Sequence, residues 1–224
     1  MYITAVGKKK KKAVTKGGEN TLLVLFLSSS ALTPEECQPL VTPLSLADPS
    51  LMYGKWMFVS GYTDHDAIKA ILNVTDSSWI SITASPSSPS EIVMSHDNKM
   101  MGTCFFTTAN ATIEGNTATV MNPNMTSEFH VLPSCQDCLL LSINNTLKNF
   151  KQMVQLMKVD DSNVPDEIHA RTFYLLGKSP FLTASDWEQF KKQTSCLGFS
   201  GEPDFKEMDK GLCKEGEGIR MPFS

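Results

Sequence analysis

Six cysteines are the residues of this sequence with the most specific chemistry: Cys37, Cys104, Cys135, Cys138, Cys196 and Cys213. An even number of cysteines that follows an export signal predicts three disulfides. Cys135 and Cys138 also form a C-x-x-C pair, a spacing that thiol–disulfide oxidoreductases use. No thioredoxin-like βαβ pattern surrounds this pair, so the sequence favours a disulfide framework over a redox site.

Four sequons offer asparagines for N-glycosylation: Asn73, Asn110, Asn124 and Asn144. A single Asn-x-Ser/Thr tripeptide arises easily by chance. Four of them, together with an even number of cysteines, support one another and predict an extracellular glycoprotein.

The remaining reactive side chains form no recognisable catalytic or metal-binding pattern. Four histidines lack the close spacing of metal ligands: His65, His96, His130 and His169. The sequence also has no nucleophile elbow, paired-carboxylate motif or glycine-rich phosphate loop. We therefore expect no catalytic residue, no metal and no other cofactor, and predict that the protein is not an enzyme.

The N-terminal segment is typical of a secretory signal with a long basic extension. Lys8–Lys12 and Lys16 precede a short apolar run, Leu22–Leu27, and small residues up to Ala31, after which cleavage is expected. The apolar run is shorter than the about 20 residues of a membrane-spanning helix. We predict a signal over 1–31 and one secreted domain over 32–224; a lysine-rich nuclear address on a cytosolic protein is the alternative.

The charge of the predicted domain is strongly acidic. The whole chain has a net charge of −4, and without its first 31 residues it has 14 basic and 23 acidic side chains, a net charge of −9. Nucleic acids and anionic membrane surfaces need a basic face, so neither is an expected partner.

Short β-rich runs alternate with polar turns along most of this domain. The predicted strands are 55–62, 77–84, 91–96, 102–109, 117–121, 127–132, 138–143 and 171–177. Helical spacing predicts one amphipathic helix through Leu147, Phe150, Val154 and Met157. A capping box, Ser185 to Glu188, predicts a second helix that ends near Cys196. The pattern indicates an all-β protein, an eight-stranded antiparallel up-and-down barrel with a C-terminal helix and a helical insertion between strands seven and eight.

Several motifs resemble the lipocalins. Gly54-Lys55-Trp56, at the start of the first strand, is similar to the lipocalin Gly-x-Trp signature, and the segment 194–213, TSCLGFSGEPDFKEMDKGLC, resembles the C-terminal stretch of α1-acid glycoprotein and apolipoprotein M. Other segments resemble the toxin-binding lipocalins of pufferfish: EECQPLVTPLSLADPS, DSSWI, LPSC, SCLGFSGEPDF and EGEGI. The resemblance covers nearly everything after Thr33.

This resemblance implies a secreted plasma glycoprotein that binds and transports a small molecule inside its barrel, either a toxin or a lipid-like ligand. It also implies the disulfides Cys37–Cys196 and Cys104–Cys213, which leaves Cys135 and Cys138 to pair with each other. Many lipocalins pack an arginine on the signature tryptophan. Here the eighth strand would end at Lys178 beside Trp56, which keeps a cation over an aromatic face.

Alternating strand directions place the connections 63–76, 97–101, 122–126 and 144–170 at the open mouth of the barrel. The long 144–170 connection is expected to fold over the mouth as a lid, with Phe150, Met153 and Met157 facing the ligand. A helix packed on the outside of the barrel is the alternative.

Alternation of side chains along each strand then selects the interior residues. Asparagines that carry glycans must point outward, which sets the parity of nearby strands. The predicted ligand-binding residues are Phe58, Tyr62, Ile80, Ile82, Met94, His96, Phe105, Phe129, Leu141 and Tyr174. Asn98 is expected near the mouth, with Asp64 and Asp66 just beyond the first strand as partners for a cationic guest.

Two further functions stay open at this point. One is a lipocalin-type lipid isomerase, which needs a free cysteine thiolate in the barrel. The other is an extracellular interaction or immune-modulating protein whose barrel is filled by its own side chains.

Overall fold

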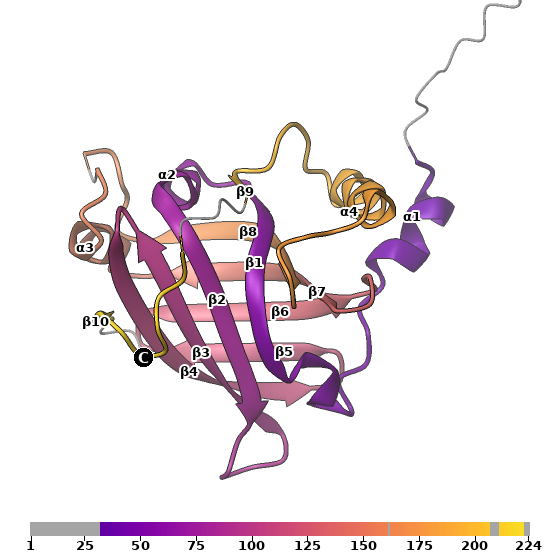
Figure 1. The fold of residues 1–224 in the computed structure, drawn as a ribbon, viewed down its shortest axis with the longest axis horizontal. Helices are drawn as coiled ribbons and strands as arrows, with labels where there is room; N and C mark the ends of the chain where they lie inside the picture. Colours follow the sequence, from indigo (N-terminus) through magenta and orange to yellow (C-terminus); the bar gives the residue numbers. More distant parts are fainter. Residues whose placement is uncertain (1–31, 161, 207–210, 222–224) are drawn as a thin grey trace, which may run out of the picture. The chain divides into compact units, whose positions relative to one another are not determined.

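The computed structural model describes residues 32–160, 162–206 and 211–221. Eight strands form the barrel: β1 (Gly54–Thr63), β2 (Thr75–Ala84), β3 (Glu91–Met100), β4 (Thr103–Glu114), β5 (Thr117–Asn122), β6 (Met125–Leu132), β7 (Cys138–Leu147) and β8 (Ile168–Gly177). Each strand pairs with the next in antiparallel fashion, and β1 pairs with β8 to close the barrel (Figure 1). The predicted eight-stranded antiparallel barrel is confirmed. The predicted signal, 1–31, lies outside the described residues.

Shorter elements surround the barrel: α1 (Pro34–Val41), η1 (Pro49–Met52), α2 (Asp66–Val74), α3 (Phe150–Leu156), α4 (Ala184–Cys196), β9 (Phe205–Lys206) and β10 (Ile219–Arg220). The two predicted helices correspond to α3 and α4, whereas α1 and α2 were not predicted. None of the helices in the described ranges is long and apolar enough to span a membrane.

The start of α4 differs from the prediction. Thr183 is the N-cap, its Oγ1 accepts a hydrogen bond from the Asp186 backbone N–H at 3.2 Å, and Asp186 accepts one from the Thr183 backbone N–H. The capping box is therefore Thr183 to Asp186, and the Ser185 to Glu188 box was wrong. Both tetrads begin with a hydroxyl residue and end with an acidic one, and only the folded backbone distinguishes them.

A β-bulge divides β1 into two halves that face different surroundings. Phe58 pairs with Leu176 on β8, but Ser60 pairs with Leu175, so Val59 is an extra residue. The bulge shifts the alternation of side chains by one position. The predicted interior direction of Tyr62 is therefore wrong, because this residue follows the shift.

Helix α4 covers the outer face of the barrel beyond this bulge. Val59, Tyr62, Phe173 and Phe190 belong to one buried apolar cluster, which we call the outer cluster. The Phe173 and Phe190 rings stack with centroids 5.3 Å apart. A disulfide, Cys37–Cys196, joins α4 to α1, which lies beside it (Figure 1).

The C-terminal segment 211–221, the strap, runs along the outside of β2–β4. The Cys104–Cys213 disulfide anchors it to β4, and β10 pairs in parallel with β4. The Trp79 indole N–H donates to the Cys213 carbonyl at 3.1 Å. Gly218 lies against the Cys104 carbonyl, where a side chain would have no room. The third disulfide is Cys135–Cys138.

The closed end of the barrel is sealed by the Gly-x-Trp segment. Lys178 Nζ lies 3.5 Å from the centroid of the Trp56 ring and also donates to the Tyr53 carbonyl at 3.4 Å. The Trp56 indole N–H donates to the Met52 carbonyl at 2.7 Å. Gly54 has a φ of +116°, and a Cβ there would lie 2.5 Å from Lys178 Nζ, so only glycine fits.

Candidate ligand-binding cavity

A cavity of about 330 Å³ occupies the mouth-side half of the barrel. Seven of the predicted ligand-binding residues line it: Phe58, Ile80, Met94, His96, Phe129, Leu141 and Tyr174. Asn98, expected near the mouth, lines it as well. These side chains come from six strands, and alternation along each strand brings them to one interior.

Three of the predicted residues do not line the cavity. Tyr62 lies in the outer cluster, because the bulge at Val59 turns it outward, and its hydroxyl donates to the Gly201 carbonyl at 3.2 Å. Ile82 has the predicted face but lies deeper, fully buried in the closed-end core. Phe105 also has the predicted face, but it packs above the cavity with Met100 and Met221.

The cavity is layered along the barrel axis. Its floor is apolar and includes Phe58, Ile80, Met94, Phe129 and Leu141. Above the floor, polar side chains from six strands form a ring, the polar belt: Ser78, His96, Asn98, Thr107, Ser127, Asn145 and Thr172. No charged side chain of the described residues lines the cavity.

Hydrogen bonds connect parts of the polar belt. Ser78 Oγ lies 2.9 Å from His96 Nε2. On the opposite wall, Asn145 accepts from Ser127 Oγ at 2.6 Å and donates to Thr172 Oγ1 at 3.3 Å.

Burial shifts the titration of two groups in this interior. Desolvation lowers the pKa of His96 to about 4, so the imidazole is neutral at physiological pH. Desolvation also raises the pKa of Tyr174 to about 12, against a hydrogen bond from Thr172 that lowers it. The interior therefore offers hydrogen-bonding groups without a charge.

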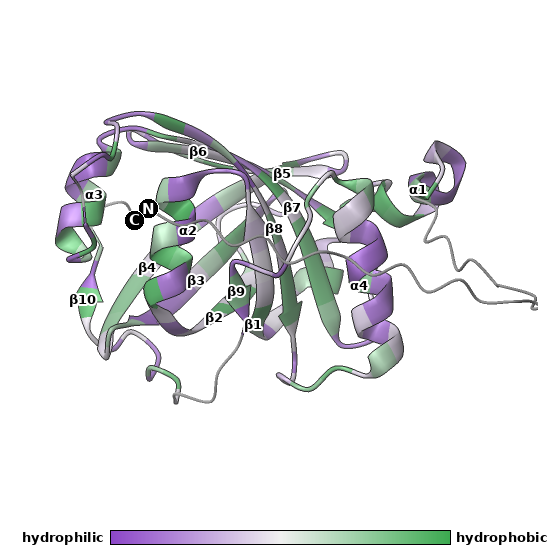
Figure 2. Cartoon of the chain, turned by 90° about the horizontal axis from the view of Figure 1, so that it is seen from above, coloured by the Kyte–Doolittle hydropathy of each residue, from purple (hydrophilic) through white to green (hydrophobic). Residues whose placement is uncertain are grey.

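Two short helices form the roof. Ile68, Ile71 and Leu72 from α2, and Met153 and Met157 at α3, line the cavity. Both helices carry hydrophobic and hydrophilic residues (Figure 2). The expected lid residues Met153 and Met157 thus face the cavity, but Phe150 is fully buried in the main core and does not line it. The spacing of Ile68, Ile71 and Leu72 is a helical signal that could have identified α2.

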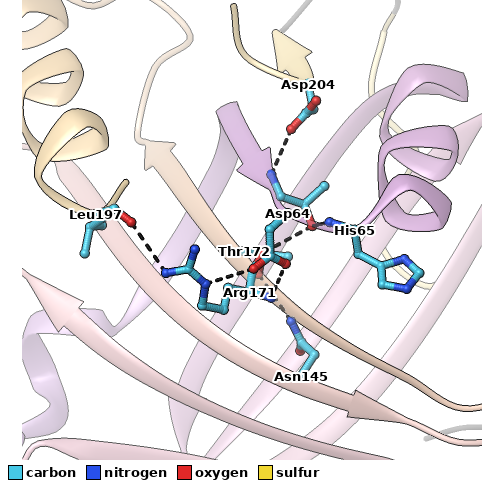
Figure 3. A network of polar contacts seen from close by, with 8 residues as sticks. Asp64, His65, Asn145, Arg171, Thr172, Leu197 and Asp204 are labelled. Carbon is cyan, nitrogen blue, oxygen red and sulfur yellow. Dashed lines mark hydrogen bonds and ion pairs between the residues drawn. The ribbon is translucent and has the colours of Figure 1, made fainter. Parts of the chain in front are cut away.

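A polar network fixes the start of α2 beside the barrel wall (Figure 3). The Asp64 carboxylate accepts from the Arg171 backbone N–H and from Arg171 Nε, both at 2.8 Å. Arg171 also donates to the Leu197 carbonyl at 3.5 Å, and Asp204 accepts from the Thr63 backbone N–H at 2.8 Å. Partial burial raises the pKa of Asp64, but the hydrogen bonds and the charge of Arg171 together outweigh it, so the pKa is lowered overall. The expected acidic groups therefore lie outside the cavity, with Asp66 exposed on α2.

Other predicted sites lie on the surface. Asn73, Asn110 and Asn144 are exposed, and Asn124 is half-buried, with its Oδ1 accepting from Asn149 Nδ2 at 2.6 Å. Among the residues that the structure describes, no group of three or more His, Cys, Asp or Glu side chains could hold a metal ion.

Solved structures share this fold. The siderocalin Ex-FABP, which functions through dual ligand specificities, matches with a TM-score of 0.51 and 13% identity over 71% of this chain and 95% of its own. The bovine lipocalin allergen Bos d 2 matches with a TM-score of 0.48 and 17% identity, over 69% of this chain and 90% of its own. The odorant binding protein OBP1 matches with a TM-score of 0.48 and 14% identity, over 71% of this chain and 90% of its own. No protein-family model and no curated protein matches the sequence. The siderocalin match shows that the chain has the lipocalin fold.

Proposed function

We propose that this protein is a carrier that binds one small, uncharged and mainly apolar molecule inside its barrel. One observation carries the proposal: a cavity of about 330 Å³ whose described lining includes no charged side chain. Concave, mainly apolar sites with a few polar groups are typical of small-molecule binding. The siderocalin and the odorant binding protein, whose names refer to ligands, are consistent with this role.

The lining favours a lipid-like or steroid-like guest over a cationic toxin. The sequence resembles the saxitoxin- and tetrodotoxin-binding protein of pufferfish, and toxin binding is our second candidate on that ground alone. A guanidinium guest needs a counter-charge or aromatic faces. Asp64 is already paired with Arg171 outside the cavity. The aromatic faces of Phe58, Phe129 and Tyr174 are therefore the groups that remain to bind a guanidinium guest.

The two other functions have less support. The isomerase needs a free thiolate, but all six cysteines are in disulfides. A barrel filled by its own side chains would leave no cavity of this size. We further propose secretion into blood plasma after removal of residues 1–31, with glycans at the four sequon asparagines.

Binding is tested with the uncharged fluorescent probe N-phenyl-1-naphthylamine. We expect saturable binding with one probe per chain, and displacement by progesterone but not by tetrodotoxin. Displacement by tetrodotoxin alone would replace the main candidate with the second one. Absence of any probe binding would overturn the carrier proposal.

A matched pair of variants places the probe. Ala109→Phe fills the cavity, whereas Thr108→Phe adds the same ring on the outer face of the same strand. We expect Ala109→Phe to weaken probe binding at least tenfold and Thr108→Phe to leave it unchanged. Equal effects of both variants would show that the probe binds elsewhere, and thermal unfolding would confirm that both are folded.

A further inference from the structure

The inward-facing side chains of four strands change twice in polarity between the closed end and the mouth. On β3 the order is Met94, His96, Asn98 and Met100. On β6 it is Phe129, Ser127 and Met125, and on β7 it is Ile143, Asn145 and Leu147. On β8, Thr172 follows Leu176 and Tyr174 and lies below the buried Ala170. The cavity is thus apolar at the bottom, polar in the middle and mainly apolar at the top, where the Thr75 hydroxyl already donates to the Ile71 carbonyl at 2.9 Å.

The belt residues occupy two adjacent levels of the strand register, with Ser78 and Asn98 nearer the mouth than His96 and Thr107. His96 pairs directly with Thr107 on β4, and Ser78 pairs with Asn98 on β3. Ser127 pairs with Asn145 across β6 and β7. Six strands therefore contribute to the same ring, whereas an accidental polar side chain would occur on one strand alone.

Part of the belt has hydrogen-bonding capacity to spare. His96 Nε2 is engaged by Ser78, and within the described chain the other ring nitrogen has no hydrogen-bond partner. The side chains of Asn98 and Thr107 likewise have no hydrogen bond to another described residue. These three side chains are half-buried and face the cavity, where only water or a guest can complete their hydrogen bonds. The spare groups therefore favour a guest that carries a polar atom at this level.

The layers above and below the belt limit the rest of the guest. Met100, Leu147 and Met153 lie above it and Phe58, Ile80 and Leu141 below it. A polar group placed in either layer would lose its hydrogen bonds to water without compensation. A charged group would cost more, because the described lining has no counter-charge.

We propose that the guest is an uncharged molecule with a hydrogen-bonding oxygen near the middle of its length and apolar groups at both ends. This inference rests on the carrier function and narrows its ligand to one class. Molecules whose polar group is terminal, such as fatty acids or long-chain methyl ketones, fit less well. Their polar end would meet the apolar floor or roof.

Two positional isomers test the inference with identical composition and similar cost of desolvation. 8-Pentadecanone has its carbonyl at the centre of the chain, and 2-pentadecanone has it at one end. We expect 8-pentadecanone to displace N-phenyl-1-naphthylamine at about 3- to 10-fold lower concentration, as one net hydrogen bond predicts. Equal displacement by the two ketones, with probe binding intact, would overturn the inference and leave the carrier function standing.

A pair of variants assigns the preference to the belt. Thr107→Val removes a belt hydroxyl that has no hydrogen bond to another described residue, and Thr108→Val makes the same change on the outer face of the same strand. We expect the preference for 8-pentadecanone to fall below twofold in Thr107→Val and to persist in Thr108→Val. A preference that persists in both, and also in His96→Leu, would show that the belt does not select the guest.

Discussion

The closed end and the mouth of the barrel are built in different ways. At the closed end, Ile82, Ile92 and Ala111 have no exposed surface and belong to one buried apolar core. At the mouth, two short helices cover a cavity, with the Asp64–Arg171 salt bridge beside the start of α2, and the strap is fixed along the neighbouring strands by a disulfide and hydrogen bonds. The difference teaches that packing stabilises one end, whereas contacts between distant segments hold the other.

Removal of the disulfide at the strap is expected to have the largest effect. Cys104→Ser with Cys213→Ser opens a cross-link that spans 109 residues, and we expect the free energy of unfolding to fall by about 4 kcal/mol. Denaturation in urea measures it. The matched change at Cys135 and Cys138, separated by only 3 residues, is expected to cost less. Similar losses of unfolding free energy for both cysteine pairs would contradict the view that contacts between distant segments stabilise the mouth.

Truncation within one cross-strand pair compares packing with cavity lining directly. Ile82 on β2 pairs with Met94 on β3, but Ile82 is in the solid core and Met94 lines the cavity. We expect Ile82→Ala to reduce the free energy of unfolding by about 3 kcal/mol. Met94→Ala enlarges an existing cavity and is expected to cost about half as much. A larger loss for Met94→Ala would mean that the cavity is not open in solution.

Acid should weaken the mouth-side half through His96. The pKa of His96 is about 4 in the native state, against 6.5 for an unperturbed histidine such as that of the unfolded chain. As the pH falls, the unfolded chain therefore binds a proton before the native state does. The free energy of unfolding therefore decreases as pH falls from about 6.5 towards 4, and by pH 4.5 the loss is about 2 kcal/mol. Urea denaturation at pH 7 and 4.5 measures it, and His96→Gln should remove that part. An unchanged pH dependence in His96→Gln would contradict this assignment.

The smallest effect is expected at the sealed end. Lys178→Met removes the cation over the Trp56 ring but keeps an apolar stem, and should cost about 0.5–1 kcal/mol in urea denaturation. Lys178→Arg retains a cation and should cost less. If Lys178→Met costs as much as Ile82→Ala, the closed end depends on this contact rather than on packing.

Sequence patterns predicted the regular part of the molecule better than its mouth. All eight strands were located, because alternating apolar residues such as Leu139 and Leu141 reflect a local period of two. Ile80 and Met94 followed from the same period. The turn signals between strands supplied the connections.

The errors arose where distant contacts decide the conformation. Tyr62 was misplaced because nothing in its neighbours' identities marks an extra residue at Val59; the bulge is visible only in the pairing with β8. Phe105 has the predicted direction, but at the mouth end of β4 it packs against Met221, which is far away in the sequence. The same holds for α2, whose position depends on the pairing of Asp64 with Arg171.

The bulge in β1 also has a consequence for protein engineering. Substitutions at Phe58 would alter the guest's compartment, whereas substitutions at Tyr62, four positions later, would alter the seat of α4. Because Val59 is the extra residue, deleting it would remove the bulge and leave Phe58 facing inward and Tyr62 facing outward. Libraries for new specificities should therefore treat the residues before and after Val59 as two independent targets.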